Sequence, residues 1–173
     1  MAKTESVSVN RRSEILSAAI EVFAEIGYFR ATTAQVAERA SISQSYVFRF
    51  FATKEALLLA AIEASWQRVL DSFRQVVESA TPEQLEHDLI LVYEEILAKH
   101  QNEVLLQMQA QTIREPAIQD AMRDGFRQVR VTVLNAFRKA GLPQPEERTM
   151  LFLARGMLCN VAVALNMPEL KEF

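Results

Sequence analysis

The chain has 173 residues, of which about half are apolar and 24% are charged, and this composition fits one globular domain or two small ones. Four glycines and five prolines are too few for a sandwich of short strands or a disordered chain, and the single cysteine, Cys159, excludes an intramolecular disulfide framework. The net charge of −3 argues against a generally basic nucleic-acid binder, but residues 1–54 hold seven Lys and Arg against five Asp and Glu, which favours an anionic partner for this part.

Apolar residues recur at steps of three and four along nearly the whole chain, and this period predicts an all-helical fold. The first helix is expected over residues 10–26, with Gly27 as its stop. Thr32 and Gln35 have the spacing of a capping box, in which each side chain accepts a hydrogen bond from the backbone amide of the other residue. They predict a short second helix that ends near residue 40.

The next three helix starts are marked by hydroxyl residues. Ser43 is expected to cap a third helix that reaches Phe51, and Thr53 to cap a long fourth helix. Thr81-Pro82-Glu83-Gln84 combines a capping box with proline at the first helical position, so a helix is predicted to start there.

Three more helices are expected over residues 102–114, 116–139 and 146–166. The last is apolar nearly all round and almost long enough to span a bilayer. Arg155 and Asn160 oppose insertion, so a helix buried by protein is favoured over a membrane span. The N-terminus carries no apolar signal segment, which predicts a cytoplasmic protein.

Nothing in the sequence predicts catalysis. It contains no glycine-rich phosphate loop, no zinc-protease motif and no nucleophile elbow. His87 and His100 lack the spacing of metal ligands. Glu94 and Glu95 are adjacent on a predicted helix and therefore point about 100° apart. We expect no enzyme activity, no metal and no cofactor.

Residues 32–51 have the pattern of a helix-turn-helix, in which Ala37 is small enough to let two helices cross closely. The second helix of such a motif enters a major groove with its first residues on base edges. Here these residues are Gln44, Ser45 and Tyr46. Glutamine pairs with adenine, serine bonds donors or acceptors, and an exposed tyrosine packs on a thymine methyl or bonds a phosphate. An ordinary pair of antiparallel helices is the alternative.

The same segment resembles the DNA-binding domain of the TetR family of transcriptional regulators, and the resemblance extends over about residues 11–60. It is carried by TTAQVAERASIS at residues 32–43, QSYVFRFF at residues 44–51 and TKEAL at residues 53–57. It implies a DNA-binding domain over residues 1–53 and a helical ligand-binding and dimerisation domain over residues 54–173. The family function that it implies is that of a homodimeric repressor, which binds an inverted-repeat operator in double-stranded DNA and responds to a small molecule.

The resemblance also assigns roles to individual residues. Thr33 and Lys54 would hold phosphates from the starts of their helices, where free amides and the helix dipole favour anions. Arg11 and Arg12 would touch the flanking backbone of the DNA. The full set expected at the operator is Thr33, Ser43, Gln44, Ser45, Tyr46, Arg49 and Lys54.

Three positions depart from the family pattern. Ser41 stands where the family usually has glycine, and a left-handed backbone at this serine would cost about 1–2 kcal/mol. Phe48 and Phe50 replace the usual tyrosine and histidine of the recognition helix, so two polar contacts to phosphate are expected to be absent.

The second half is expected to supply a dimer interface and an apolar cavity. The final helix needs burial on more than one side, so we expect it to form a four-helix interface together with the helix over 116–139 and the same two helices of a partner subunit. Inward-facing side chains predict a pocket for an apolar or aromatic effector. The expected lining is Trp66, Phe73, Tyr93, Met108, Gln109, Phe126, Met157 and Asn160. The alternative function is a helical ligand-binding or interaction protein whose helix-turn-helix no longer binds DNA.

Overall fold

The computed structural model describes the backbone of residues 2–171 and the side chains of residues 11–171, and over this part the chain is helical without strands. The predicted all-helical fold is therefore confirmed. The helices are α1 (Ala2–Ile26), α2 (Thr33–Arg39), α3 (Gln44–Phe48), α4 (Lys54–Ser79), α5 (Leu85–Lys99), α6 (Gln101–Ala110), α7 (Pro116–Lys139), α8 (Pro145–Leu165) and the 3-10 helix η1 (Pro168–Lys171).

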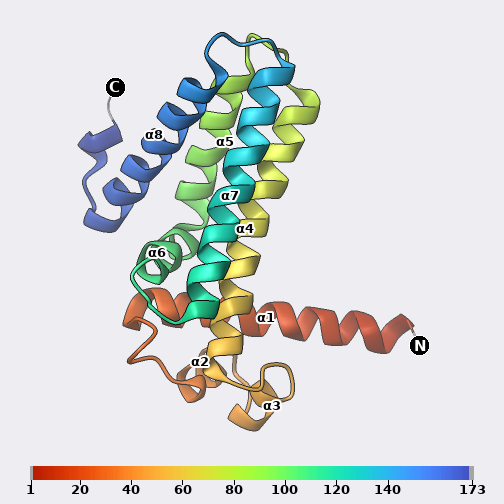
Figure 1. Cartoon of the computed structure of the whole chain (residues 1–173). Coiled ribbons are helices and arrows are strands. Elements are labelled where there is room, and N and C mark those ends of the chain that lie inside the picture. Colours follow the sequence, from red (N-terminus) through yellow and green to blue (C-terminus); the bar gives the residue numbers. More distant parts are fainter. Residues whose placement is uncertain (1, 172–173) are drawn as a thin grey trace.

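The long helix α4 connects the two ends of the molecule (Figure 1). Helix α1 crosses its first turns, and α2 and α3 lie at that same end, away from the bundle. Further along, α4 packs against α5 and α7, while α8 contacts α5, α6 and α7. Helix α6 contacts both α1 and α8. One hydrophobic core therefore runs from the N-terminal helices into the bundle.

Side-chain caps start three helices as the sequence predicts. At α2, Thr32 Oγ1 accepts a hydrogen bond from the amide of Gln35 at 3.3 Å, and Gln35 Oε1 accepts one from the amide of Thr32 at 2.9 Å. Ser43 and Thr53 each accept a hydrogen bond from the amide three residues further on, at the starts of α3 and α4. These caps are local, so the sequence alone determines them.

Two boundaries differ from the prediction in the N-terminal part. Helix α1 begins at Ala2 rather than at residue 10, since no glycine or proline interrupts the preceding residues. Helix α3 ends at Phe48 rather than at Phe51. The amide of Phe50 bonds the carbonyl of Val47, three residues back, and this tighter turn ends the α-helix while it leaves Phe51 buried.

The capping box predicted at Thr81 is wrong. Helix α5 begins at Leu85, and Gln84 at its cap makes no side-chain hydrogen bond. The backbone carbonyl of Thr81 instead accepts from the amides of Gln84 and Leu85, at 3.1 and 3.0 Å. This turn satisfies the amides with backbone alone, so the hydroxyl is not used. Helix α6 is also shorter than predicted and ends at Ala110.

The left-handed backbone expected at Ser41 is present, with a φ of 54° in the turn between α2 and α3. A non-glycine residue pays about 1–2 kcal/mol for this conformation. Gly27, with a φ of 83°, follows α1 as the predicted stop, and Gly141, with a φ of 70°, ends α7 in the same way.

Helix α8 is the one helix in the described part of the chain that is long and apolar enough to cross a membrane, a test of length and composition only. Core helices of soluble proteins pass the same test. One side of α8 packs on α5, α6 and α7. On that side Arg155 pairs with Glu94 of α5 at 3.4 Å.

Candidate functional site

The helix-turn-helix is held by a small apolar core. Val36 and Ala37 of α2 and Val47 of α3 are almost fully buried. Ile42, in the turn, is half-buried and packs against them. Because Val47 faces the core, the opposite side of α3 faces solvent at the end of the molecule (Figure 1).

The polar residues predicted to meet DNA at this end are partly bonded to one another. The Ser43 hydroxyl accepts a hydrogen bond from the Tyr46 amide and lies 3.0 Å from the Ser45 hydroxyl. Gln44 Nε2 donates to Thr33 Oγ1 at 2.8 Å. Thr33 is buried, so its hydroxyl serves to fix α3 against α2. Gln44 and Ser45 remain exposed at the surface.

Three aromatic side chains and one arginine complete the surface of α3 and of the turn that follows it. Tyr46 and Phe50 are half-buried and pack edge to face, with ring centroids 5.4 Å apart. The guanidinium of Arg49 lies over the Tyr46 ring, 5.2 Å from its centroid. Phe48 is 46% exposed and points outward. Helix α3 and the turn after it therefore present a mixed aromatic and cationic face.

Lys54 starts α4, but its ammonium group points back into the molecule. Nζ donates to the carbonyls of Tyr28 and Ala31, at 2.8 and 3.0 Å, and lies 3.5 Å from the carbonyl of Phe29. It also lies 4.6 Å from the centroid of the Tyr28 ring. The side chain thus fastens the loop between α1 and α2.

Ion pairs fix α2 on α1. Arg39 bonds Glu21 and Glu25 of α1, at 2.9 and 2.7 Å. Its hydrogen bond lowers the pKa of Glu25. Arg11 and Arg12, which were predicted to touch the DNA backbone, also have partners within the protein. Arg11 pairs with Glu14, and Arg12 lies over the ring of Phe51, 5.0 Å from its centroid.

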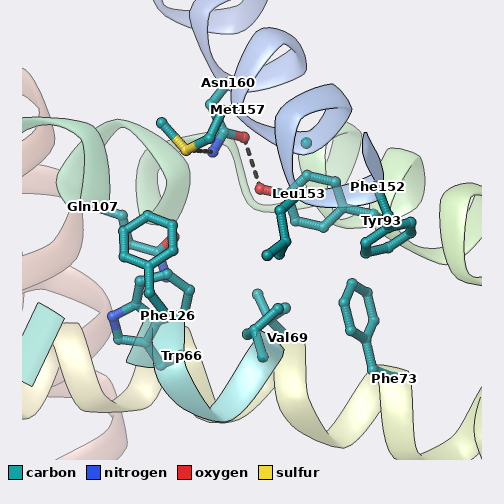
Figure 2. A pocket seen from close by; sticks show the side chains of 12 residues that line it. Trp66, Val69, Phe73, Tyr93, Gln107, Phe126, Phe152, Leu153, Met157 and Asn160 are labelled. Carbon is teal, nitrogen blue, oxygen red and sulfur yellow. Dashed lines mark hydrogen bonds between the residues drawn. The ribbon is translucent and has the colours of Figure 1, made fainter. Parts of the chain in front are cut away.

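Six of the eight side chains predicted to line a pocket surround one cavity between α4, α5, α7 and α8 (Figure 2). Met108 and Gln109 do not line it. Gln109 Nε2 instead donates to the carbonyl of Ala24 at the end of α1, at 2.7 Å. The residue of α6 that reaches the cavity is Gln107. The sequence did not predict it, because α6 is short and its apolar residues show little periodicity. The lining is Trp66, Val69, Phe73, Tyr93, Gln107, Phe126, Val129, Phe152, Leu153, Gly156, Met157 and Asn160.

The cavity is apolar with a small polar end. The Tyr93 hydroxyl donates to Asn160 Oδ1 at 2.7 Å (Figure 2). Burial raises the pKa of Tyr93 to about 12, so the phenol is neutral. None of the lining residues is charged, and the free volume is about 40 Å³. Pockets for drug-sized ligands hold roughly 300–1,000 Å³, so a ligand of that size requires this one to open.

Trp66 forms the end wall of the cavity through an unusually close contact. Its ring packs on Phe126, with centroids 4.9 Å apart, and lies flat on the backbone of α7 at Gly125. A Cβ atom at position 125 would collide with the indole ring of Trp66. The buried indole N–H has no hydrogen-bond partner among the described residues. The ring can therefore move without the loss of a hydrogen bond.

Two glycine substitutions beside aromatic residues of the cavity are expected to have opposite effects. Gly125→Ala should destabilise the fold by about 1–3 kcal/mol, because the new methyl group collides with Trp66. Gly156→Ala should stabilise it by about 0.5–1 kcal/mol, because its Cβ would lie an ordinary 3.5 Å from Tyr93 and alanine favours a helix. Thermal unfolding measures both. Trp66 is the only tryptophan, so its fluorescence should change in the first variant alone.

Gly156→Ala is thus the matched control for Gly125→Ala. Equal melting temperatures for the two variants would contradict the close contact of Trp66 with α7.

Helix α6 links the cavity to the N-terminal helices. Gln107 Nε2 donates to the buried Ser65 hydroxyl of α4 at 3.0 Å. Two residues further, Gln109 bonds the end of α1. Glu103 is almost buried and bonds Arg68 of α4 through both oxygens at 2.9 Å. A shift of α6 would therefore be transmitted to α1 and α4 together.

The outward side of α8 carries a regular apolar row. Its members are spaced alternately three and four residues apart, which is the spacing of a coiled-coil seam. Leu151 and Leu165 are 57% and 61% exposed, and Leu158 between them is 36% exposed. Helix α7 was expected to join α8 in a dimer interface. Its apolar side packs on α4, and Val131 is its one large exposed apolar residue in the described part of the chain. The row consists of Leu151, Ala154, Leu158, Val161 and Leu165.

The N-terminal region is similar to known regulatory proteins. Residues 15–61 match the model described as "Bacterial regulatory proteins, tetR family". The HTH-type transcriptional regulator HbdR of Aromatoleum sp. (strain CIB) is 33% identical over 76 residues, which are 44% of this chain and only 30% of that protein. The HTH-type transcriptional regulator UidR of Escherichia coli (strain K12) is 26% identical over 161 residues, covering 87% of this chain and 81% of UidR.

A solved structure shares the fold over most of the chain. FadR from Bacillus subtilis, in complex with stearoyl-CoA, superposes with a TM-score of 0.76 at 14% identity and covers 89% of this chain and 88% of its own. The shared fold includes the bundle as well as the helix-turn-helix.

Proposed function

We propose that this chain, a transcriptional regulator of the TetR family, is a homodimeric repressor that binds a palindromic DNA operator in the cytoplasm and releases it when an apolar effector enters the bundle. The observation that carries the proposal is the helix-turn-helix, with the outer face of α3 exposed at one end of the molecule (Figure 1). Residues 1–53 would form the DNA-binding domain and residues 54–173 the regulatory domain. The relatives are named as transcriptional regulators, which supports a binding function rather than an enzymatic one.

The contacts within the motif support a proposed role for each of the predicted DNA residues. Ser45, Arg49 and the free oxygen of Gln44 would face bases or phosphates in the major groove. Thr33 and Ser43 would orient α3, because their hydroxyls are bonded within the motif. Lys54 would hold the loop while the amides at the start of the long helix α4 face a phosphate. Tyr46 would position Arg49, because the guanidinium of Arg49 lies over the Tyr46 ring.

The partner subunit would pack on the row of α8. A row of this spacing lets two helices interlock side chains, and a two-fold axis makes the contact self-complementary. An apolar row of about four helical turns on the outer side of α8 is otherwise unfavourable for a soluble protein. A dimer would also present two copies of α3 to successive major grooves, which lie about 34 Å apart.

The effector would act by opening the cavity. In the structure the cavity is too small for a drug-sized molecule, so a ligand binds only to a conformer with displaced walls. The Trp66 ring would move, since its indole N–H has no hydrogen bond to lose. Helix α6 would transmit the movement, because it is bonded to both α1 and α4. FadR, which has the same fold, was solved with stearoyl-CoA, and this supports an effector with a long apolar chain.

In vitro selection from random duplex DNA at two salt concentrations tests the proposal. We expect an enriched inverted repeat whose affinity falls steeply with salt, because each phosphate contact adds about −0.9 to the slope of log affinity against log salt. If a folded dimer enriches no sequence at low salt, the alternative of a binding protein without operator affinity replaces this one.

Titration with stearoyl-CoA tests the effector class. Because Trp66 lines the cavity and is the only tryptophan, its emission should change saturably with stearoyl-CoA, and the selected operator should be released. Coenzyme A without the acyl chain is the control and should change neither signal. Gly156→Leu, which fills the cavity beside Tyr93, should weaken the response. An unchanged emission would exclude this class of effector.

A further inference from the structure

We propose that Phe48 recognises thymine methyl groups, so that an apolar contact sets part of the operator sequence. The inference rests on the proposed DNA-binding function, because it concerns the same helix. Two large apolar side chains of residues 11–53 are exposed, Phe29 at 72% and Phe48 at 46%. Phe29 lies in the loop after α1, and Phe48 lies on α3.

The position of Phe48 on α3 directs it toward a DNA partner. Val47 is fully buried and fixes the rotation of the helix. Ser45, Phe48 and Arg49 are all exposed, and their spacing of three and four residues places them on one face. An arginine and a serine beside the phenylalanine are the residues that meet phosphates and base edges, so the occupant of this face is DNA rather than an apolar protein surface.

The neighbouring side chains are engaged within the protein, so Phe48 is the residue available for an apolar contact with DNA. Tyr46, the residue predicted to pack on a thymine methyl, is half-buried between Phe50 and Arg49. Gln44 is bonded to Thr33. Phe48 packs in none of these pairs and projects furthest into solvent among the aromatic residues of α3.

The chemistry of the groove identifies what Phe48 contacts. A phenyl ring neither donates nor accepts a conventional hydrogen bond, so it cannot replace the tyrosine hydroxyl that the family uses on a phosphate. The apolar group that the major groove offers is the C5-methyl of thymine. Covering one such methyl group corresponds to about fourfold in Kd.

The test replaces thymines of the selected operator by deoxyuridine, which removes only the methyl group. With the full chain, substitution of the two symmetry-related thymines under Phe48 should weaken binding about sixteenfold, fourfold for each half-site. Phe48→Ala should bind thymine and deoxyuridine operators equally. Phe29→Ala is the matched control, an exposed phenylalanine outside α3, and should keep the full difference. Phe48→Asn repeats the test should the alanine variant not fold.

The outcomes separate the two proposals. If the wild-type protein binds no selected operator, the proposed function fails. If it binds the operator but deoxyuridine at every thymine leaves Kd unchanged, the role of Phe48 is overturned. The role is also overturned if Phe48→Ala weakens binding while its sensitivity to deoxyuridine remains.

Discussion

Leu158→Lys is expected to make the protein monomeric and to lower its affinity for the selected operator about a hundredfold or more. Leu158 is the centre of the exposed row of α8, and a two-fold interface would place the two lysine side chains close together in an apolar contact. A dimer gains its second half-site without a further loss of translational freedom, and linked sites of this kind gain factors of roughly 10²–10⁴. Sedimentation and operator titration measure the two effects.

Leu91→Lys is the control for this substitution. Leu91 is 44% exposed on α5, outside the row, and the same charge there should leave both the dimer and the operator affinity unchanged. A Leu158→Lys protein that stays dimeric would show that the subunits meet elsewhere. A monomeric Leu158→Lys protein that kept full operator affinity would show that operator binding does not depend on dimerisation.

Lys54→Met is expected to lower the melting temperature by about 4–8 °C and to weaken binding to all DNA sequences. The substitution leaves the carbonyls of Tyr28 and Ala31 without the ammonium that bonds them, at a cost of about 2 kcal/mol. In a chain of this length each kcal/mol corresponds to about 2–4 °C. The loop that joins α1 to α2 would loosen, and α3 would lose its fixed position. Thermal unfolding and DNA titration at several salt concentrations measure these changes.

The salt dependence distinguishes this role of Lys54 from a direct phosphate contact. Because the ammonium bonds the protein itself, the slope of log affinity against log salt should stay the same. A slope reduced by about 0.9 at an unchanged melting temperature would place the ammonium on a phosphate instead. Lys99→Met is the control, since Lys99 forms an exposed ion pair with Glu95 and its loss should move the melting temperature little.

Much of the fold was predictable because its signals are local. The capping box of Thr32 and Gln35, the caps at Ser43 and Thr53 and the glycine stops each depend on residues at most four apart. The capping box predicted at Thr81 does not form although its residues match the pattern. The backbone carbonyl of Thr81, rather than its side chain, accepts the hydrogen bonds of the Gln84 and Leu85 amides. Local patterns thus identify helices more securely than they identify the atoms that start them.

The candidate sites were predictable in part. The position of inward-facing residues in long helices follows from their period, and Trp66 and Phe126, which the period predicts to face inward, line the cavity. On the short helix α6 the period is weak, and the choice between Gln107 and its neighbours depended on how α6 crosses α1 and α4.

Residue types at fixed short spacings specify the helical class, the helix-turn-helix and the apolar character of the last helix, so these features are predictable from the sequence. Which side chains are free to act depends on how the helices pack. Lys54 bonds carbonyls 23 and 26 residues away, and Thr33 is engaged by Gln44, while Phe48 stays exposed. Such partners depend on the crossing of separate helices, and a spacing along the chain carries no information about where two distant helices meet.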